Sequence, residues 1–156
     1  MEPAREYTIT VLKELLNLCK EERSLFVSAI EKLEDNSVKQ NFQNYIKEKT
    51  ELICKTESEI KRLGGSLENL EGINSFNQNI PSDKKSNSEE DTIVHYCLEK
   101  DDSILDRYSF AMNEDIMWEV VPFIAKQYFD SKNLHERILF NCVIKRQQNL
   151  ALGNVS

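Results

Sequence analysis

Turn-forming residues are scarce in this chain, because its 156 residues include only four Gly and three Pro. An all-β fold needs many tight turns, and these counts supply too few of the residues that form them. No apolar run approaches the roughly 18 residues that a membrane-spanning helix requires. The first residues, MEPAREYT, also lack the hydrophobic segment of a secretory signal. We therefore expect an all-α, cytoplasmic protein without a membrane partner.

Positive charge is in short supply as well. The chain has 20 Lys and Arg against 27 Asp and Glu, for a formal net charge of −7. A surface of this sign repels polyphosphate, so we expect no nucleic-acid partner.

Close pairs of cysteines are absent. The four cysteines lie far apart in the sequence and form no CxxC motif: Cys19, Cys54, Cys97 and Cys142. The spacing predicts reduced thiols packed in the core rather than a disulfide framework or a zinc knuckle.

What the chain does contain is long stretches in which apolar residues recur every three or four positions, the pattern of amphipathic helices. Asn36 or Ser37 can cap the second stretch, and Gly64-Gly65 can end it. The predicted helices lie within a single domain, 1–156, and span about 6–34, 37–63, 89–112 and 116–147.

The segment 64–88 joins the second and third of these helices and is rich in Asn, Ser and Gly. It is too long for a tight turn between antiparallel neighbours, but it can run the length of a bundle. The sequence therefore predicts an up-down four-helix bundle with one long crossover.

Each predicted helix carries a polar residue near the middle of its apolar face. These residues are Glu22 on the first helix, Glu48 and Lys49 on the second, Asp101 on the third and His135 on the fourth. Counted from the short joints, we expect Glu22, Lys49 and Asp101 at one level. His135 is expected about one or two turns beyond it, unless a kink at Pro122 shifts the register.

Buried charges are costly unless they are paired, so these residues need partners. An ion-pair network around Lys49 would satisfy them, and the sequence favours this interpretation. The alternative is a metal site for iron, manganese or zinc. Its candidate ligands are Glu22, Glu48, Asp101 and His135, with Glu51 in reserve.

Catalytic motifs are not evident. No Ser or Cys has a His and an acid at a recognisable spacing, so we expect no catalytic residues. His95 lies off the apolar face of its helix and is expected at the rim or surface.

Several phrases carry a family likeness over about residues 10–65 and 92–145, namely EIKRLGG, CLEKDDSILDRY and KNLHERI, together with the region of the first joint. On these residues the chain resembles the small, mostly uncharacterised ferritin-like four-helix proteins of bacteria. The resemblance implies a ferritin-like bundle with one crossover, often as a dimer or larger assembly.

The wider ferritin-like group binds two metals through a glutamate from each of two helices and Glu-x-x-His from each of the other two. This chain departs from that pattern, because Glu48 is followed three residues later by Glu51, and Lys132 stands three residues before His135. Ser24 also stands where relatives tend to carry an acid. The di-metal ligand set is incomplete, which argues against ferroxidase or oxygenase chemistry.

The most apolar stretch surrounds Trp118 and includes Ile116, Met117, Val120, Val121 and Phe123. It can pack in the core under the crossover or form a contact surface for a second copy.

We expect a non-enzymatic bundle without a cofactor. It would act by self-association, as a homo-oligomer such as a dimer, or by binding an unidentified protein partner. The alternative is a ferritin-like protein that binds iron or zinc, with a redox or metal-handling role.

Overall fold

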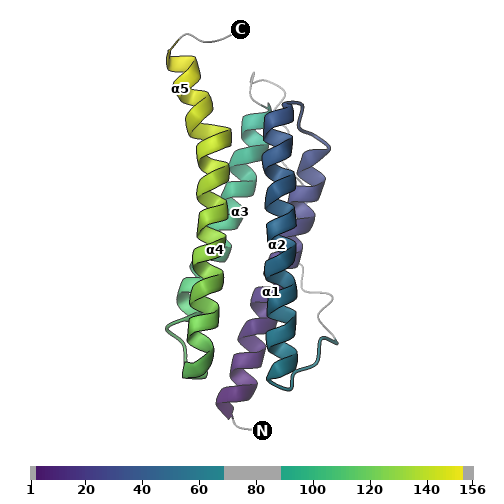
Figure 1. Ribbon diagram of the computed structural model, residues 1–156, viewed down its shortest axis with the longest axis vertical. Coiled ribbons are helices and arrows are strands. Elements are labelled where there is room, and N and C mark those ends of the chain that lie inside the picture. The colour runs from purple at the N-terminus through teal and green to yellow at the C-terminus, as the bar shows by residue number, and fades with distance from the viewer. Residues whose placement is uncertain (1–2, 69–88, 153–156) are drawn as a thin grey trace.

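Four long helices dominate the computed structural model, which describes residues 3–68 and 89–152 (Figure 1). They are α1 (Pro3–Ile30), α2 (Asn36–Arg62), α3 (Glu89–Ala111) and α4 (Val121–Leu139). A short 3-10 helix, η1 (Trp118–Val120), precedes α4, and a π-helix, η2 (Phe140–Ile144), joins it to α5 (Lys145–Ala151). No strand occurs in the described residues, so the predicted all-α class is confirmed for them. None of their helices is long and apolar enough to cross a membrane.

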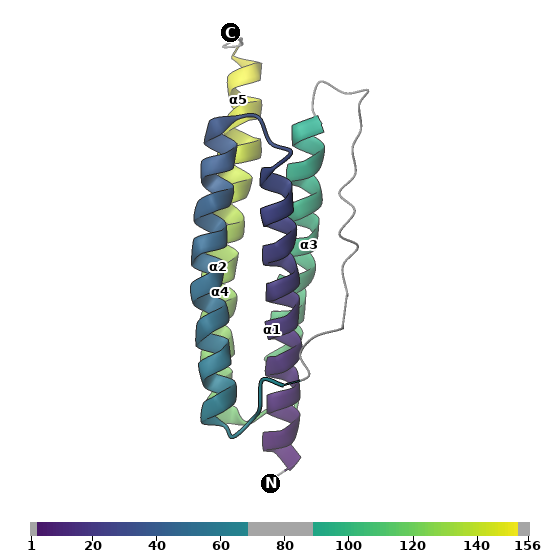
Figure 2. The same cartoon turned by 90° about the vertical axis from the view of Figure 1, so that its right-hand side faces the viewer.

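The helices pack as a bundle in which α1 contacts α2 and α3, and α4 contacts α3 and α2. Each of these neighbours runs antiparallel to its partner, whereas α2 and α3 run in the same direction (Figures 1 and 2). The parallel pair follows from the connection, because α3 begins at the opposite end of the bundle from the end of α2. Most of the predicted crossover, residues 69–88, lies outside the described residues.

The helix ends differ in detail from the sequence expectation. The first helix ends at Ile30 rather than near 34, and the cap of α2 is Asp35 rather than Asn36 or Ser37. The Asp35 carboxylate accepts hydrogen bonds from the backbone N–H of Ser37 (2.8 Å) and Val38 (3.2 Å). Asp35 has extended backbone geometry, which positions its side chain to satisfy the free N–H groups of the first turn.

Gly64 ends α2 as the sequence predicted. Its φ of 87° is the left-handed conformation that glycine adopts without steric cost. The backbone N–H of Gly64 bonds to the carbonyl of Lys61 and that of Gly65 to the carbonyl of Ile60, both at 2.9 Å. This pair of bonds is the Schellman motif, which satisfies the last carbonyls of a helix.

The predicted fourth helix is divided. Pro122 lies in the first turn of α4, where its missing N–H has no intrahelical role, so it starts the helix rather than kinking it. The stretch around Trp118 is divided too. Val120 is fully buried, whereas the Trp118 side chain is 83 % exposed.

Two apolar clusters fill the bundle, one towards the α1–α2 joint and the other towards the opposite end. In the first cluster the Phe26 ring stacks on Tyr45 with centroids 4.0 Å apart. Burial of each large apolar side chain contributes about 1.5–3 kcal/mol to folding. The clusters are separated by a layer of buried polar side chains, namely Glu22, Lys49, Thr56, Asp101, Gln127, Ser131 and His135.

Candidate functional site

The Tyr45 hydroxyl lies between two buried carboxyl groups at the middle of the bundle. It is 2.6 Å from Glu22 Oε1 and 2.7 Å from Asp101 Oδ1. Because a phenol has a single proton, it donates fully to only one of the two oxygens. Burial and the charge of Asp101 raise the pKa of Glu22 well above its usual range. Glu22 therefore binds a proton more readily than a free carboxyl group does, and the Tyr45 hydroxyl links the two side chains.

Lys49 supplies a buried positive charge to the cluster. Both Lys49 and Glu22 are fully buried, and Lys49 Nζ lies 3.2 Å from Glu22 Oε1. Nζ has no aligned hydrogen-bond acceptor within the described chain, so this contact is chiefly one of charge. Burial lowers the pKa of Lys49, but the neighbouring Glu22, Cys19 and Asp101 outweigh it and leave the pKa raised. The side chain is therefore an ammonium ion at neutral pH.

His135 connects the cluster to the surface. Its Nδ1 lies 2.7 Å from Asp101 Oδ2, and its Nε2 lies 3.4 Å from Asp102 Oδ1. Burial lowers the pKa of His135, but the hydrogen bond and charge of Asp101, together with Asp102, raise it overall. Burial would raise the pKa of Asp101, but bonds from His135, Glu22 and Tyr45 and the charge of Lys49 lower it to about 2. Asp101 and His135 thus form an ion pair when the imidazole is protonated.

The expected displacement of His135 from the mid-bundle level is wrong. The structure places it in direct contact with Asp101. The cause is the start of α4, which begins at Val121 rather than near residue 116. The later start brings His135 closer, along the bundle axis, to the joint between α3 and α4.

Glu48 does not join the other three predicted ligands. Its carboxylate pairs with Arg137 Nη1 at 2.8 Å and with Nη2 at 3.3 Å, on the outside of the bundle. The side chain of Glu48 is 39 % exposed, while that of Lys49 is fully buried. Consecutive helical residues differ in direction by about 100°, so only one of these two neighbours can point to the centre. The reserve residue Glu51 is exposed as well.

A family model described as "Domain of unknown function (DUF2383)" matches residues 7–114. The chain belongs to this family. The match covers α1, α2 and α3, and therefore Glu22, Tyr45, Lys49 and Asp101, whereas His135 lies beyond it. No curated protein matches the chain.

This DUF2383 chain also has a second polar group in the same layer, which the sequence analysis missed. Cys19 Sγ lies 3.3 Å from the Tyr108 hydroxyl, which donates to Gln127 Oε1 at 3.1 Å. Gln127 Nε2 in turn donates to the carbonyl of Leu52 at 3.1 Å. The apolar spacing of their helices places Tyr45 and Tyr108 on the inward faces, and a buried tyrosine hydroxyl needs a hydrogen-bond partner. This requirement is the sequence signal by which the hydrogen-bonded groups around Tyr45 and Tyr108 could have been found.

The cluster is a poor fit to the metal centre that the ferritin-like resemblance implies. Its groups contact one another in pairs, His135 with Asp101 and Tyr45 with both Asp101 and Glu22, and do not form a shell around one point. The Lys49 ammonium stands beside Glu22, where it would repel a cation. Within residues 3–68 and 89–152, no group of three or more His, Cys, Asp or Glu side chains is arranged to hold a metal ion.

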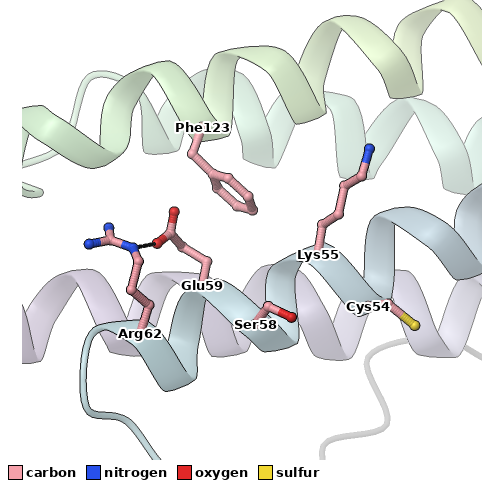
Figure 3. Close-up of a pocket in the computed structure, with 6 residues that line it drawn as sticks. All are labelled: Cys54, Lys55, Ser58, Glu59, Arg62 and Phe123. Carbon is pink, nitrogen blue, oxygen red and sulfur yellow. Dashed lines mark hydrogen bonds and ion pairs between the residues drawn. The ribbon is translucent and has the colours of Figure 1, made fainter.

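A groove of about 380 Å³ lies elsewhere, between α2 and α4 (Figure 3). It is lined by Cys54, Lys55, Ser58, Glu59, Arg62 and Phe123, and none of these belongs to the buried cluster. Arg62 pairs with Glu59, and Cys54 points away from the Phe123 ring. The buried charges and the surface groove are therefore separate features.

Proposed function

We propose that this DUF2383 protein is a ferritin-like bundle that acts by self-association or by binding a protein partner, rather than by chemistry at its centre. The observation that carries the proposal is a set of large aromatic side chains exposed to solvent. They are Trp118 (83 % exposed), Phe129 (59 %) and Phe140 (51 %). Contiguous exposed apolar surface marks interaction sites on soluble proteins.

The arrangement of the helices supports the ferritin-like part of the proposal. Two antiparallel pairs, α1 with α2 and α3 with α4, pack so that α2 and α3 are parallel (Figure 2). Polar side chains from all four helices meet halfway along the bundle, as in ferritin-like proteins.

The composition of the buried cluster supports a structural rather than a catalytic centre. The positive charges of Lys49 and His135 are close to the carboxyl groups of Glu22 and Asp101. In this arrangement Lys49 provides the positive charge that a bound cation would otherwise contribute.

Sedimentation measured from low to high micromolar concentration tests the proposal, together with identification of proteins that co-purify from native cells. We expect a dimer or larger assembly, or a stoichiometric partner. A chain that stays monomeric over the whole range and co-purifies with no stoichiometric partner would refute the proposal.

The second candidate function is the binding of iron or zinc, favoured by the meeting of Glu22, Asp101 and His135 at one level. Metal analysis after purification without chelator tests it. A stoichiometric metal that is lost in Asp101→Ala and retained in Glu48→Gln would support this function, because Glu48 lies outside the cluster. The absence of metal, with no change in melting temperature on adding iron or zinc, would reject it.

A further inference from the structure

One face of the fourth helical rod carries a continuous stripe of residues that point away from the bundle. Its members recur every three or four positions, the spacing that keeps side chains on one side of a helix. They are Trp118, Pro122, Ala125, Phe129, Asn133, Glu136, Phe140 and Ile144, and all except the half-buried Ala125 are exposed. The opposite face of the rod carries the buried residues Ile124, Gln127, Ser131, Leu134 and Ile138.

The stripe is complementary to itself when reversed. Phe129 and Phe140 lie equally far from a point between residues 134 and 135, and so do Asn133 and Glu136. In an antiparallel pair related by a two-fold axis at that point, each Phe129 faces Phe140 of the other copy. Each Asn133 amide then faces a Glu136 carboxylate, so the polar groups at the centre of the contact are satisfied.

The charged residues beside the stripe also fit a two-fold antiparallel pair. Lys132 is exposed one turn before Glu136. In the antiparallel pair the ammonium of each copy approaches the carboxylate of the other, which gives two opposite-charge contacts across the axis.

The two ends of the rod are complementary as well. Arg146 still pairs with Asp91 near the start of α3, at 3.2 Å, but α5 continues past the ends of the other helices (Figures 1 and 2). Leu152, the residue that follows α5, is 74 % exposed. Trp118 at the other end lies as far from the midpoint as residue 151 does. A reversed second copy would therefore place its projecting α5 over Trp118.

We infer that a second copy of this chain docks on this face, with the rod formed by α4, η2 and α5 packed antiparallel against its counterpart. The inference rests on the proposed function, of which it specifies the partner and the surface. The rod from Val121 to Ala151 is about 45 Å long at about 1.5 Å per residue, so the contact runs along the whole bundle. A two-fold contact of this kind closes on itself and produces a dimer rather than a filament.

A charge-pair experiment on the full-length chain tests both the face and the direction of the contact. Phe129→Lys and Phe140→Glu are made singly and together, with Phe110→Lys as the matched control. Phe110 is also an exposed aromatic residue, but it lies on α3 rather than on the rod. Residues 129 and 140 are about 16 Å apart along one helix, so the introduced charges cannot pair within a chain. All variants are checked for wild-type helicity and a cooperative unfolding transition, because none of the changed residues is buried.

We expect each single variant at position 129 or 140 to raise the dimer dissociation constant at least tenfold, and the double variant to recover most of this loss. The control should match the wild type. If the single variants dimerise like the wild type, this face is wrong while the proposed self-association stands. If both singles dissociate and the double variant does not recover, the antiparallel register is wrong, and if Phe110→Lys dissociates equally, the face is not specific. A wild type that is monomeric throughout would remove self-association itself.

Discussion

Two acids and two bases share the centre of this bundle, and their contacts determine their states. Glu22 and Lys49 are fully buried, and Asp101 is almost so, at 1 % exposed. An ion in such a place is tolerated only when a partner and hydrogen bonds replace the water that it has lost. The Tyr45 hydroxyl, between the two carboxyl groups, provides part of that replacement. At the scale of single residues, the cluster is therefore a set of mutually dependent groups.

Removal of Lys49 should be strongly destabilising. Lys49→Met leaves the carboxyl groups of Glu22 and Asp101 without their ammonium neighbour, and breaking a buried pair costs about 3–5 kcal/mol. Urea unfolding would measure the loss. The double variant Lys49→Met with Glu22→Gln should be more stable than Lys49→Met alone, because the charge left unpaired is also removed. Equal stability of the two variants would contradict the pairing described here.

Stability should depend on pH through the pair of His135 and Asp101. The folded-state pKa of His135 is raised by Asp101 and Asp102, so its contribution is complete below about pH 6.5 and is lost as pH rises through the folded value. The pKa of Asp101 is lowered to about 2, so its contribution is present above about pH 4 and is lost as pH falls towards 2. Because the pKa of Glu22 is raised in the folded state, this carboxyl group also lowers the free energy of unfolding as pH rises.

Chemical denaturation between about pH 5 and pH 9 would measure this dependence. We expect the free energy of unfolding to fall as pH rises, and to fall less steeply in His135→Gln. His95→Gln is the matched control, because His95 is exposed on α3. A wild-type slope in the His135 variant would show that its imidazole does not carry the effect.

At the scale of the element, the helix ends depend on single side chains and on glycine. Asp35 closes the first turn of α2, and its own backbone N–H points to the carboxylate of Glu90 at 3.3 Å. The α1–α2 joint is thus tied to the first turn of α3. The π turn of η2 adds a residue to one turn of the rod and leaves Cys142 buried while Phe140 and Ile144 face outwards.

Asp35→Ala should lower the free energy of unfolding by about 1 kcal/mol, within the 0.5–2 kcal/mol range for loss of an N-cap. The neighbouring Asn36→Ala serves as the control, because Asn36 is exposed and does not provide the cap. Thermal or urea unfolding followed by circular dichroism would measure both. A loss in Asn36→Ala equal to that in Asp35→Ala would contradict the assignment of the cap.

At the scale of the whole molecule, the apolar side chains that form the core are distinct from the exposed ones on the fourth rod. Two apolar clusters close the bundle on either side of the polar layer, so the core is satisfied within one chain. The exposed aromatic residues of α4 and η1 take no part in either cluster. This exposed apolar surface is the basis for the proposed docking of a second copy on the rod.

The chain has a single tryptophan, which makes the docking face visible by fluorescence. Trp118 is 83 % exposed in one chain, and the proposed second copy covers it. We expect its emission to shift to shorter wavelength, and its quenching by acrylamide to weaken, as protein concentration rises through the dimerisation range. Phe140→Glu should show neither change over the same range. Unchanged Trp118 emission in a sample that sedimentation shows to be dimeric would place the contact elsewhere.

The sequence alone predicted the all-α class, the four long helices and the glycine that ends α2, because apolar spacing and helix termination are local properties of the chain. It also identified Glu22, Asp101 and His135 as polar residues on apolar faces. It left open whether Glu48 or Lys49 points inwards, and it misjudged the height of His135. Each depends on how a helix is rotated or where it starts, which packing against other helices decides.

Only the tertiary structure brought the Tyr45 hydroxyl between two carboxyl groups and turned Trp118 outwards beside the buried Val120. Residues such as Glu22, Tyr45 and Asp101 lie far apart in the chain, and no local pattern records the distance between them. Their meeting is a result of three helices packing at one level, where the loss of water makes each polar group require the others.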